Sequence, residues 1–408
     1  MFRQRPPIFG GKDKTIPRNR EKTRTFAGKK TIVRHLIELR HILHAHPELS
    51  GQEKLTNGIL NEWVRQTRPD LLIGHIGGYG LAAVYKGAAP GKRILIRGDI
   101  DALHIPEPDD IAYRSQNQGV SHKCGHDGHA TILCGLAQWL GEQRPDRGEV
   151  VLLFQPAEET GQGAQAVLGD PKFEQIKPDM AYGFHNLPGF PKGQVLVRDG
   201  CFAAASFGLK LCFDGRTAHA SQPETGHSPS ELTATLLHLL EKKRELLKAM
   251  KPLTTFVITH AALGEETFGV APGHAEIWLT LRSFDDRNLE LLASQVIALC
   301  RAKAKDRLFD FSFTEHEAFA ATNSDARCVR TIERAAQNLA LNLGRLEAPF
   351  RWSEDFGRFG SVCPIGFFGL GSGMEQPALH DPEYDFPDDI IEAGMGMFWE
   401  ILRMELEA

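Results

Sequence analysis

The sequence predicts an α/β fold: a mixed sheet flanked by helices, with a smaller domain inserted into the chain. Nearly continuous apolar runs such as KRILIRGD (92–99) and EVVLLFQP (149–156) alternate with longer segments of helical periodicity. Such runs are typical of strands that are buried on both faces. The length of 408 residues also favours two domains over a single core.

The first part of the chain accounts for most of the expected sheet. A helix is predicted over residues 31–46, where apolar side chains recur at helical spacing until Pro47 stops the pattern. Buried strands and one further helix follow it. The strands are expected at 81–87, 92–99, 149–156 and 179–185, and the helix at 128–143.

The pattern changes near Gly200, where residues 206–213 begin to alternate apolar and polar side chains, as in a strand with one wet face. From there the expected order is β-α-β-β-α-β, the ferredoxin-like unit. The later elements of this unit are predicted at 228–250, 253–260, 274–284, 286–305 and 307–315. We therefore expect an inserted domain over 201–315. Residues 31–200 and 316–408 then form one discontinuous domain, with helices near 324–341 and 387–406 around a strand at 363–370.

Composition limits the classes of partner. The net charge of −5 argues against binding to nucleic acid or to a membrane surface, and no apolar stretch is long enough to span a bilayer. Residues 1–30 differ, because they hold ten lysines and arginines against two acidic residues. We expect this segment to be a basic, disordered arm. The seven scattered cysteines, without a CxxC motif, indicate a cytoplasmic protein.

The segment SHKCGHDGH (121–129) concentrates metal-binding side chains. Cys124 and His126 are separated by one glycine, and in an extended loop residues two apart point the same way. Thiolate and imidazole groups are ligands of zinc-like ions. The alternative is a polar surface loop leading into a helix, and His122 and His129 are assigned to that alternative.

Acidic residues follow two of the predicted strands, where open α/β sheets collect their chemistry. Of Glu158 and Glu159, one could ligate a metal ion while the other acts as general base on its water; an exposed acidic loop is the alternative. Asp99 and Asp101 either hydrogen-bond a ligand imidazole or cap a turn.

Two more histidines are candidate ligands, although each taken singly is an ordinary surface or core residue. His185 closes a predicted strand, and His380 lies in a proline-bracketed loop near the C-terminus. Together the candidates exceed the needs of one tetrahedral ion, so they indicate a two-metal site with water activated between the ions. A single structural zinc at Cys124 and His126 is the simpler alternative.

Eight motifs in order give the chain a clear resemblance. They are RHILHAHPELS (40–50), RGDIDALHIPE (97–107), HKCGHDGHA (122–130), FQPAEETGQGA (154–164), GFHNLPG (183–189), GRTAHASQPETGHSP (215–229), WSEDF (352–356) and LHDPEYDFPDD (379–389). Over residues 31–408 the chain resembles the M20 family of metallo-amidohydrolases. The most similar branch holds hippurate hydrolase, N-acyl-amino-acid amidohydrolases and auxin-conjugate hydrolases.

The resemblance implies two divalent ions per subunit, zinc or manganese with nickel or cobalt as options. It also implies that the inserted domain is a lid that mediates a homodimer. Glu158 would be the general base, and His219 would steady the oxyanion, in some arrangements from the partner subunit. Asp101 joins this catalytic set because it could orient a ligand imidazole. The implied metal ligands are Cys124, His126, Glu159, His185 and His380.

The expected reaction is hydrolysis of the amide bond of an N-acyl amino acid or a related small conjugate. Arg282 is the candidate for binding the substrate carboxylate, with an ordinary surface arginine as the alternative. A dipeptidase or carboxypeptidase acting through the same site is the nearest rival. A non-catalytic binding protein on this scaffold is the alternative from another class.

Overall fold

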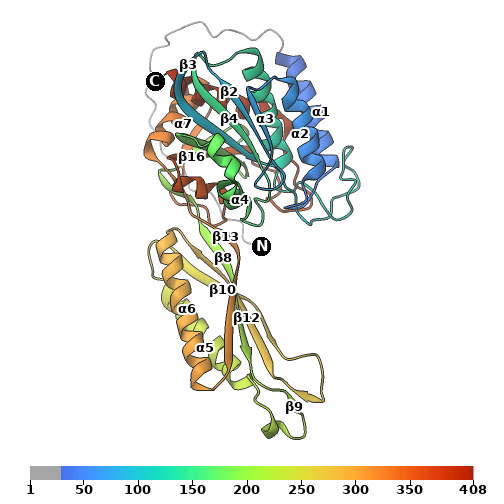
Figure 1. The fold of residues 1–408 in the computed structure, drawn as a ribbon, viewed down its shortest axis with the longest axis vertical. Coiled ribbons are helices and arrows are strands. Elements are labelled where there is room, and N and C mark those ends of the chain that lie inside the picture. The colour runs from blue at the N-terminus through green and yellow to red at the C-terminus, as the bar shows by residue number, and fades with distance from the viewer. Residues whose placement is uncertain (1–28, 408) are drawn as a thin grey trace.

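The chain folds around two separate β-sheets, which form the two lobes of an elongated molecule (Figure 1). The computed structural model describes residues 29–407, so the basic arm predicted over 1–30 lies almost wholly outside the described residues. The larger lobe holds an eight-stranded sheet, and the smaller lobe holds a four-stranded sheet.

The large sheet is mixed, as the sequence predicted. Its central strands β4, β3, β5 and β16 are parallel, whereas β1, β2 and β6 join by antiparallel pairs. The spatial order is β1-β2-β4-β3-β5-β16-β6-β15. The strands are β1 (Leu71–Ile76), β2 (Gly80–Lys86), β3 (Ala89–Asp99), β4 (Arg147–Gln155), β5 (Met180–Pro188), β6 (Val195–Val197), β15 (Leu343–Arg345) and β16 (Ile365–Gly373).

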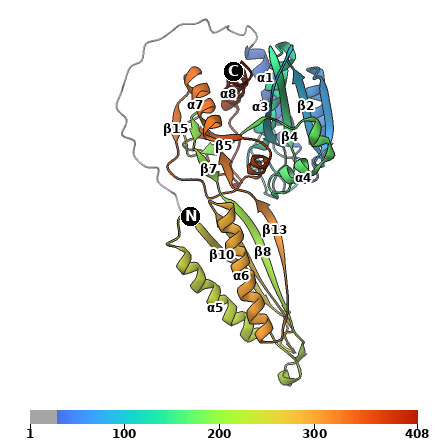
Figure 2. The same ribbon diagram turned by 60° about the vertical axis from the view of Figure 1, so that its left-hand side comes forward.

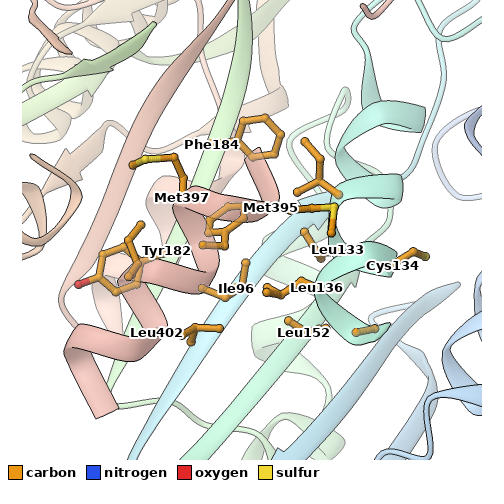
Figure 3. Packing of buried hydrophobic residues seen from close by; sticks show 14 of the residues in the cluster. Ile96, Leu133, Cys134, Leu136, Leu152, Tyr182, Phe184, Met395, Met397 and Leu402 are labelled. Carbon is orange, nitrogen blue, oxygen red and sulfur yellow. The ribbon is translucent and has the colours of Figure 1, made fainter. Parts of the chain in front are cut away.

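Helices cover both faces of this sheet. On one face lie α1 (Lys29–Ala45), α2 (Lys54–Gln66), α3 (His126–Glu142), α7 (Ala326–Asn338) and α8 (Ile391–Glu407). Figure 3 shows Leu133 and Leu136 of α3 packed with Met395 of α8 over the strands. Each such fully buried side chain contributes about 1.5–3 kcal/mol. The other face is covered by α4 (Gly163–Gly169), by 3₁₀ segments and by loops.

The small lobe is a four-stranded antiparallel sheet in the order β10-β12-β8-β13. Its helices α5 and α6 cover one face only (Figure 2). Along the chain the elements are β8 (Ala205–Asp214), α5 (Ser230–Leu247), β10 (Thr254–Leu263), β12 (His274–Ser283), α6 (Asp286–Asp306) and β13 (Asp310–Phe319). A two-residue pair, β9 (Ala218–His219) with β11 (Val270–Ala271), lies at the far tip (Figure 1).

Several elements differ from the sequence expectation. The helix α2 and the strand β1 were not predicted, because their polar and glycine residues obscure the apolar pattern. The predicted boundary between the two lobes, at Gly200, lies a few residues before the boundary in the structure. Strand β7 (Gly200–Ala203) pairs with β14 (Thr322–Ser324), and its Phe202 is buried in the core of the large lobe.

The described residues contain no helix that is both long and apolar enough to cross a bilayer. All seven cysteines fall within this part of the chain, and each is a free thiol.

Candidate metal centre

Five side chains from four segments of the chain meet at the edge of the large sheet where its parallel strands end. Cys124 precedes α3, His126 is the first residue of α3, and Glu159 follows β4. His185 lies within β5 rather than in a loop beyond it, since β5 continues to Pro188 through its pairing with β16. His380 comes from the loop before α8.

The distances within this group are short. The Cys124 sulfur lies 3.4 Å from His185 Nε2 and 3.4 Å from His380 Nε2. Glu159 Oε1 lies 3.6 Å from His380 Nε2 and 3.8 Å from His126 Nε2. Two overlapping triads have ligand atoms that all lie within 4.8 Å of one another: Cys124, His126 and His185, and Cys124, Glu159 and His380.

The donor atoms fit a metal ion better than they fit one another. Among the described residues, His126 Nε2 and Glu159 Oε1 are buried without a hydrogen-bond partner, although they face each other. Leaving such atoms unsatisfied is costly, and a cation between them would remove that cost. The mixed sulfur, nitrogen and oxygen donors suit zinc-like divalent ions.

The backbone at Gly125 explains how Cys124 and His126 reach the same point. Gly125 has φ +89° at the N-terminus of α3, in the left-handed region that favours glycine. A Cβ at this position would lie 2.7 Å from the side chain of Asn186. Only glycine therefore allows this close turn.

Asp101 connects two of the candidate ligands. Its Oδ1 lies 3.2 Å from Nδ1 of His126, and its backbone oxygen lies 3.0 Å from the same nitrogen. Its Oδ2 accepts hydrogen bonds from the Glu159 backbone N–H at 3.0 Å and from the Ser50 hydroxyl at 2.7 Å. These contacts orient the imidazole so that Nε2 points away from Asp101 into the cluster.

The carboxylates around the cluster favour a positive charge at its centre. Burial disfavours the protonated ring of His126, but Asp99, Asp101 and Glu159 outweigh it and raise its pKa to about 10. Burial raises the pKa of Glu159 to about 7, and burial with nearby carboxylates raises the pKa of Cys124. Without a cation, protons would therefore occupy positions that a divalent ion could take.

Glu158 lies beside the cluster and is also buried. Its Oε1 accepts a hydrogen bond from the Asp355 backbone N–H at 3.3 Å. Burial and the charges of Glu354, Glu159 and Asp355 raise its pKa well above the ordinary value. A carboxylate that holds a proton readily is suited to proton transfer.

A buried arginine that was not singled out from the sequence pairs with three buried carboxylates beside Glu158. Arg97 is fully buried and lies 2.6 Å from Asp99, 2.9 Å from Glu354 and 2.6 Å from Asp355. It belongs to the RGDID motif, and two of its partners belong to WSEDF. The presence of one basic and one acidic motif was the only signal in the sequence for these ion pairs, and it does not show that the two motifs are in contact.

A second buried ionic network lies next to the first turn of α3. Arg40 donates to Asp127 Oδ2 at 3.0 Å and to Asp385 Oδ1 at 3.0 Å. His44 Nδ1 lies 2.8 Å from the same Asp127 oxygen, and its Nε2 lies 2.7 Å from Glu107. The network ties α1 to α3 and to the loop that follows His380.

The interpretation of His122 and His129 as polar surface residues is wrong. Both are buried: the ring of His129 lies 4.5 Å from that of Phe184 in β5, and the ring of His122 lies 6.3 Å from that of His44 in α1. His129 Nδ1 lies 2.5 Å from Asp99, and its Nε2 lies 2.5 Å from Asn186 Oδ1. Neither ring nitrogen of His122 has a hydrogen-bond partner in the described part of the chain.

The structure does not bring His219 to the cluster. It lies in β9 at the tip of the small lobe, far from the large sheet (Figure 1). Its ring is exposed, and its Nδ1 lies 2.7 Å from the Ser221 hydroxyl.

Arg282 lies where β12 meets the large lobe. It donates to the Arg351 carbonyl at 2.7 Å and to the Ser353 hydroxyl at 3.0 Å, and no carboxylate pairs with it between residues 29 and 407. Trp352, between these two partners in sequence, contacts His185 with its ring tilted by 50°, at 5.5 Å between ring centroids. The loop 351–353 therefore links Arg282 to His185 in the group of candidate metal ligands.

Comparison with known proteins agrees with this geometry. The model of peptidase family M20/M25/M40 matches residues 95–404. The chain is 34% identical over 388 residues to N-acetyl-L-cysteine deacetylase of Bacillus subtilis, covering 93% of this chain and 90% of that one. It is 27% identical over 359 residues to hippurate hydrolase of Campylobacter jejuni, covering 87% and 92%.

Among solved structures, the chain is similar to the YXEP protein of Bacillus subtilis, described as a dinuclear metal binding peptidase from the M20 family. The TM-score is 0.78 at 25% identity, covering 93% of this chain and 99% of that one. The motif-based prediction of the family is confirmed: the chain belongs to peptidase family M20/M25/M40 and is a metal-dependent hydrolase.

Proposed function

We propose that this protein hydrolyses the amide bond of N-acyl amino acids or related small conjugates. The observation that carries the proposal is the convergence of Cys124, His126, Glu159, His185 and His380 into overlapping triads. These residues would hold two divalent ions, zinc or manganese, with nickel or cobalt as substitutes. The names of two relatives, a hippurate hydrolase and an N-acetyl-L-cysteine deacetylase, support this substrate class.

When bound, the ions would polarise the scissile carbonyl and make water acidic near neutral pH. Glu158 takes the proton of the attacking water and later delivers it to the leaving amine nitrogen. Its burial and raised pKa support this role, because the carboxyl group can hold a proton between the two steps. Asp101 serves by keeping the His126 ring in one orientation and tautomer.

Arg282 would bind the carboxylate of the amino-acid part of the substrate. Its lack of a carboxylate partner between residues 29 and 407 supports this role, as does its link to His185 through Trp352. A planar guanidinium group matches a carboxylate through paired hydrogen bonds. We expect Arg282→Met to raise KM about 10-fold or more with a smaller change in kcat.

The small lobe, predicted as residues 201–315, would act as a lid and as the contact of a homodimer. The outer edge of β10 has no strand partner among the described residues, and it exposes Val257 and Leu263. Leu246 of the neighbouring α5 is 79% exposed. Unpaired edges with exposed apolar side chains are typical of interfaces. Either lid closure or a partner subunit would then bring His219 to the substrate oxyanion.

The decisive experiment is Glu158→Gln, assayed with N-acetyl, N-benzoyl and dipeptide substrates, with and without chelator. We expect turnover to fall about 10²–10⁴-fold while the metal content per chain stays unchanged. Glu174→Gln, at an exposed position, is the matched control and should keep full activity. Retained turnover in Glu158→Gln would refute the base assignment. A preference for dipeptides over both acyl substrates would assign a dipeptidase instead.

A further inference from the structure

A second group of metal-binding side chains lies in the small lobe, on the face of its sheet that α5 and α6 leave open. Cys212 of β8 pairs across the sheet with Glu276 of β12. His274 lies two residues before Glu276 and therefore on the same face. One ligand atom from each of these three residues lies within 4.8 Å of the others.

A β-bulge brings a fourth side chain to this face. The register of β10 against β12 shifts between Ile258 and His260, so that Thr259 is an extra residue. Without the shift, His260 would point to the helix-covered side; with it, His260 lies opposite Trp278. Its Nε2 lies 3.4 Å from Glu276 Oε1. Bulges often redirect a side chain toward a functional site.

The remaining contacts orient these groups. Asp214 Oδ1 lies 2.6 Å from His274 Nδ1, the carboxylate contact that commonly orients a metal-ligating imidazole and leaves its other nitrogen available. Lys210 lies 2.5 Å from Glu276 Oε2, which holds that carboxylate in place while Oε1 faces His260.

We propose that Cys212, His260, His274 and Glu276 form a binding site for a zinc-type divalent ion, separate from the Cys124 centre in the large lobe. One thiolate, two imidazoles and one carboxylate form a set that suits tetrahedral zinc. The ligands come from three neighbouring strands, β8, β12 and β10. A bound ion would therefore clamp the edge strand β10 to the centre of a sheet whose open face no helix of the described chain covers.

The site is tested by counting metal ions on the full chain. The protein is stripped with chelator, loaded with zinc chloride and desalted, and its zinc content is measured by elemental mass spectrometry. We expect three zinc ions per wild-type chain and two for the double variant Cys212→Ser, His274→Ala. The control is His316→Ala, on the same sheet face but outside the cluster, and it should keep three.

Equal zinc content in the wild type and the double variant would overturn the proposal. Matching thermal unfolding of both proteins in chelator shows that a lost ion does not reflect a lost fold. Cobalt loading gives a second readout: Cys212→Ser should reduce the thiolate-to-cobalt absorption band, whereas an unchanged band excludes Cys212 as a ligand. The double variant should keep its hydrolase activity when both large-lobe ions are bound. Such a result shows that the ion lost from the small lobe is not one of the proposed catalytic ions.

Discussion

Replacement of the buried Arg97 by methionine is the most direct test of how the large lobe supports its carboxylates. Arg97 contacts Asp99, Glu354 and Asp355 at 2.6, 2.9 and 2.6 Å and has no exposed surface on its side chain. Methionine fills a similar apolar volume but leaves these three carboxylates without their cation. Removal of one partner from a buried ion pair costs about 3–5 kcal/mol.

In chelator, so that metal binding does not contribute, we expect the midpoint of thermal unfolding to fall by about 6–20 °C, at about 2–4 °C per kcal/mol. Arg93→Met is the matched control on the same strand. Its side chain is 28% exposed and pairs with Glu149, so its loss should cost about 1 kcal/mol or less.

The pH dependence gives this prediction a distinctive sign. Burial, only partly offset by Arg97, already raises the pKa of Asp355 to about 7, and loss of the arginine raises it further. The folded variant then binds a proton more tightly than the unfolded chain does, so its stability rises as pH falls. The deficit of Arg97→Met should shrink from pH 8 to pH 6. A deficit below about 1 kcal/mol, or one that grows as pH falls, would refute the reasoning.

Three further predictions concern the site and its surroundings. Burial opposes protonation of His44, but carboxylates on both ring nitrogens outweigh it and raise its pKa to about 9. The raised pKa contributes up to about 3 kcal/mol of stability below pH 6.5, and this contribution is lost as pH rises toward 9. The urea concentration at the midpoint of unfolding should therefore fall more steeply between pH 6.5 and 9 in the wild type than in His44→Gln. Asp101→Asn should weaken metal affinity about 10–100-fold in chelator competition, because it disturbs the contact that orients His126; unchanged affinity would contradict that role. Gly128→Ala should destabilise the folded chain by about 1–3 kcal/mol, because its Cβ would lie 2.4 Å from an aromatic ring. Gly58→Ala, in open space on α2, should stabilise it by up to about 1 kcal/mol. Equal shifts in the two thermal unfolding midpoints would contradict this reasoning.

Local sequence patterns predicted much of the fold, because buried apolar residues recur with the period of the helix or strand that carries them. The predicted strands at 92–99 and 149–156 correspond to β3 and β4, since both are buried on two faces and read as continuous apolar runs. The apolar pattern of helix α2 is weaker, because only four of its 13 residues are buried and Gly58 interrupts it.

The candidate site was predictable in its residue types but not in its arrangement. The expected ligands lie together because parallel strands end at one edge of the sheet, a rule that sequence order can use. Arg97 was missed, because its contacts with Glu354 and Asp355 join segments more than 250 residues apart. The bulge that turns His260 toward Glu276 depends on pairing with β12, and no residue type in β10 specifies it.

The sequence by itself determined the alternation of strands and helices, the family and the residues that can donate to a metal ion, because these depend on side-chain chemistry and local periodicity. Only the tertiary structure decided that His129 is buried against Asp99, that His219 lies at the far tip of the small lobe, and that one arginine holds the acidic residues beneath Glu158. The physical reason is that burial and charge pairing are properties of the packed chain: the energy of a charge depends on the groups that folding brings around it.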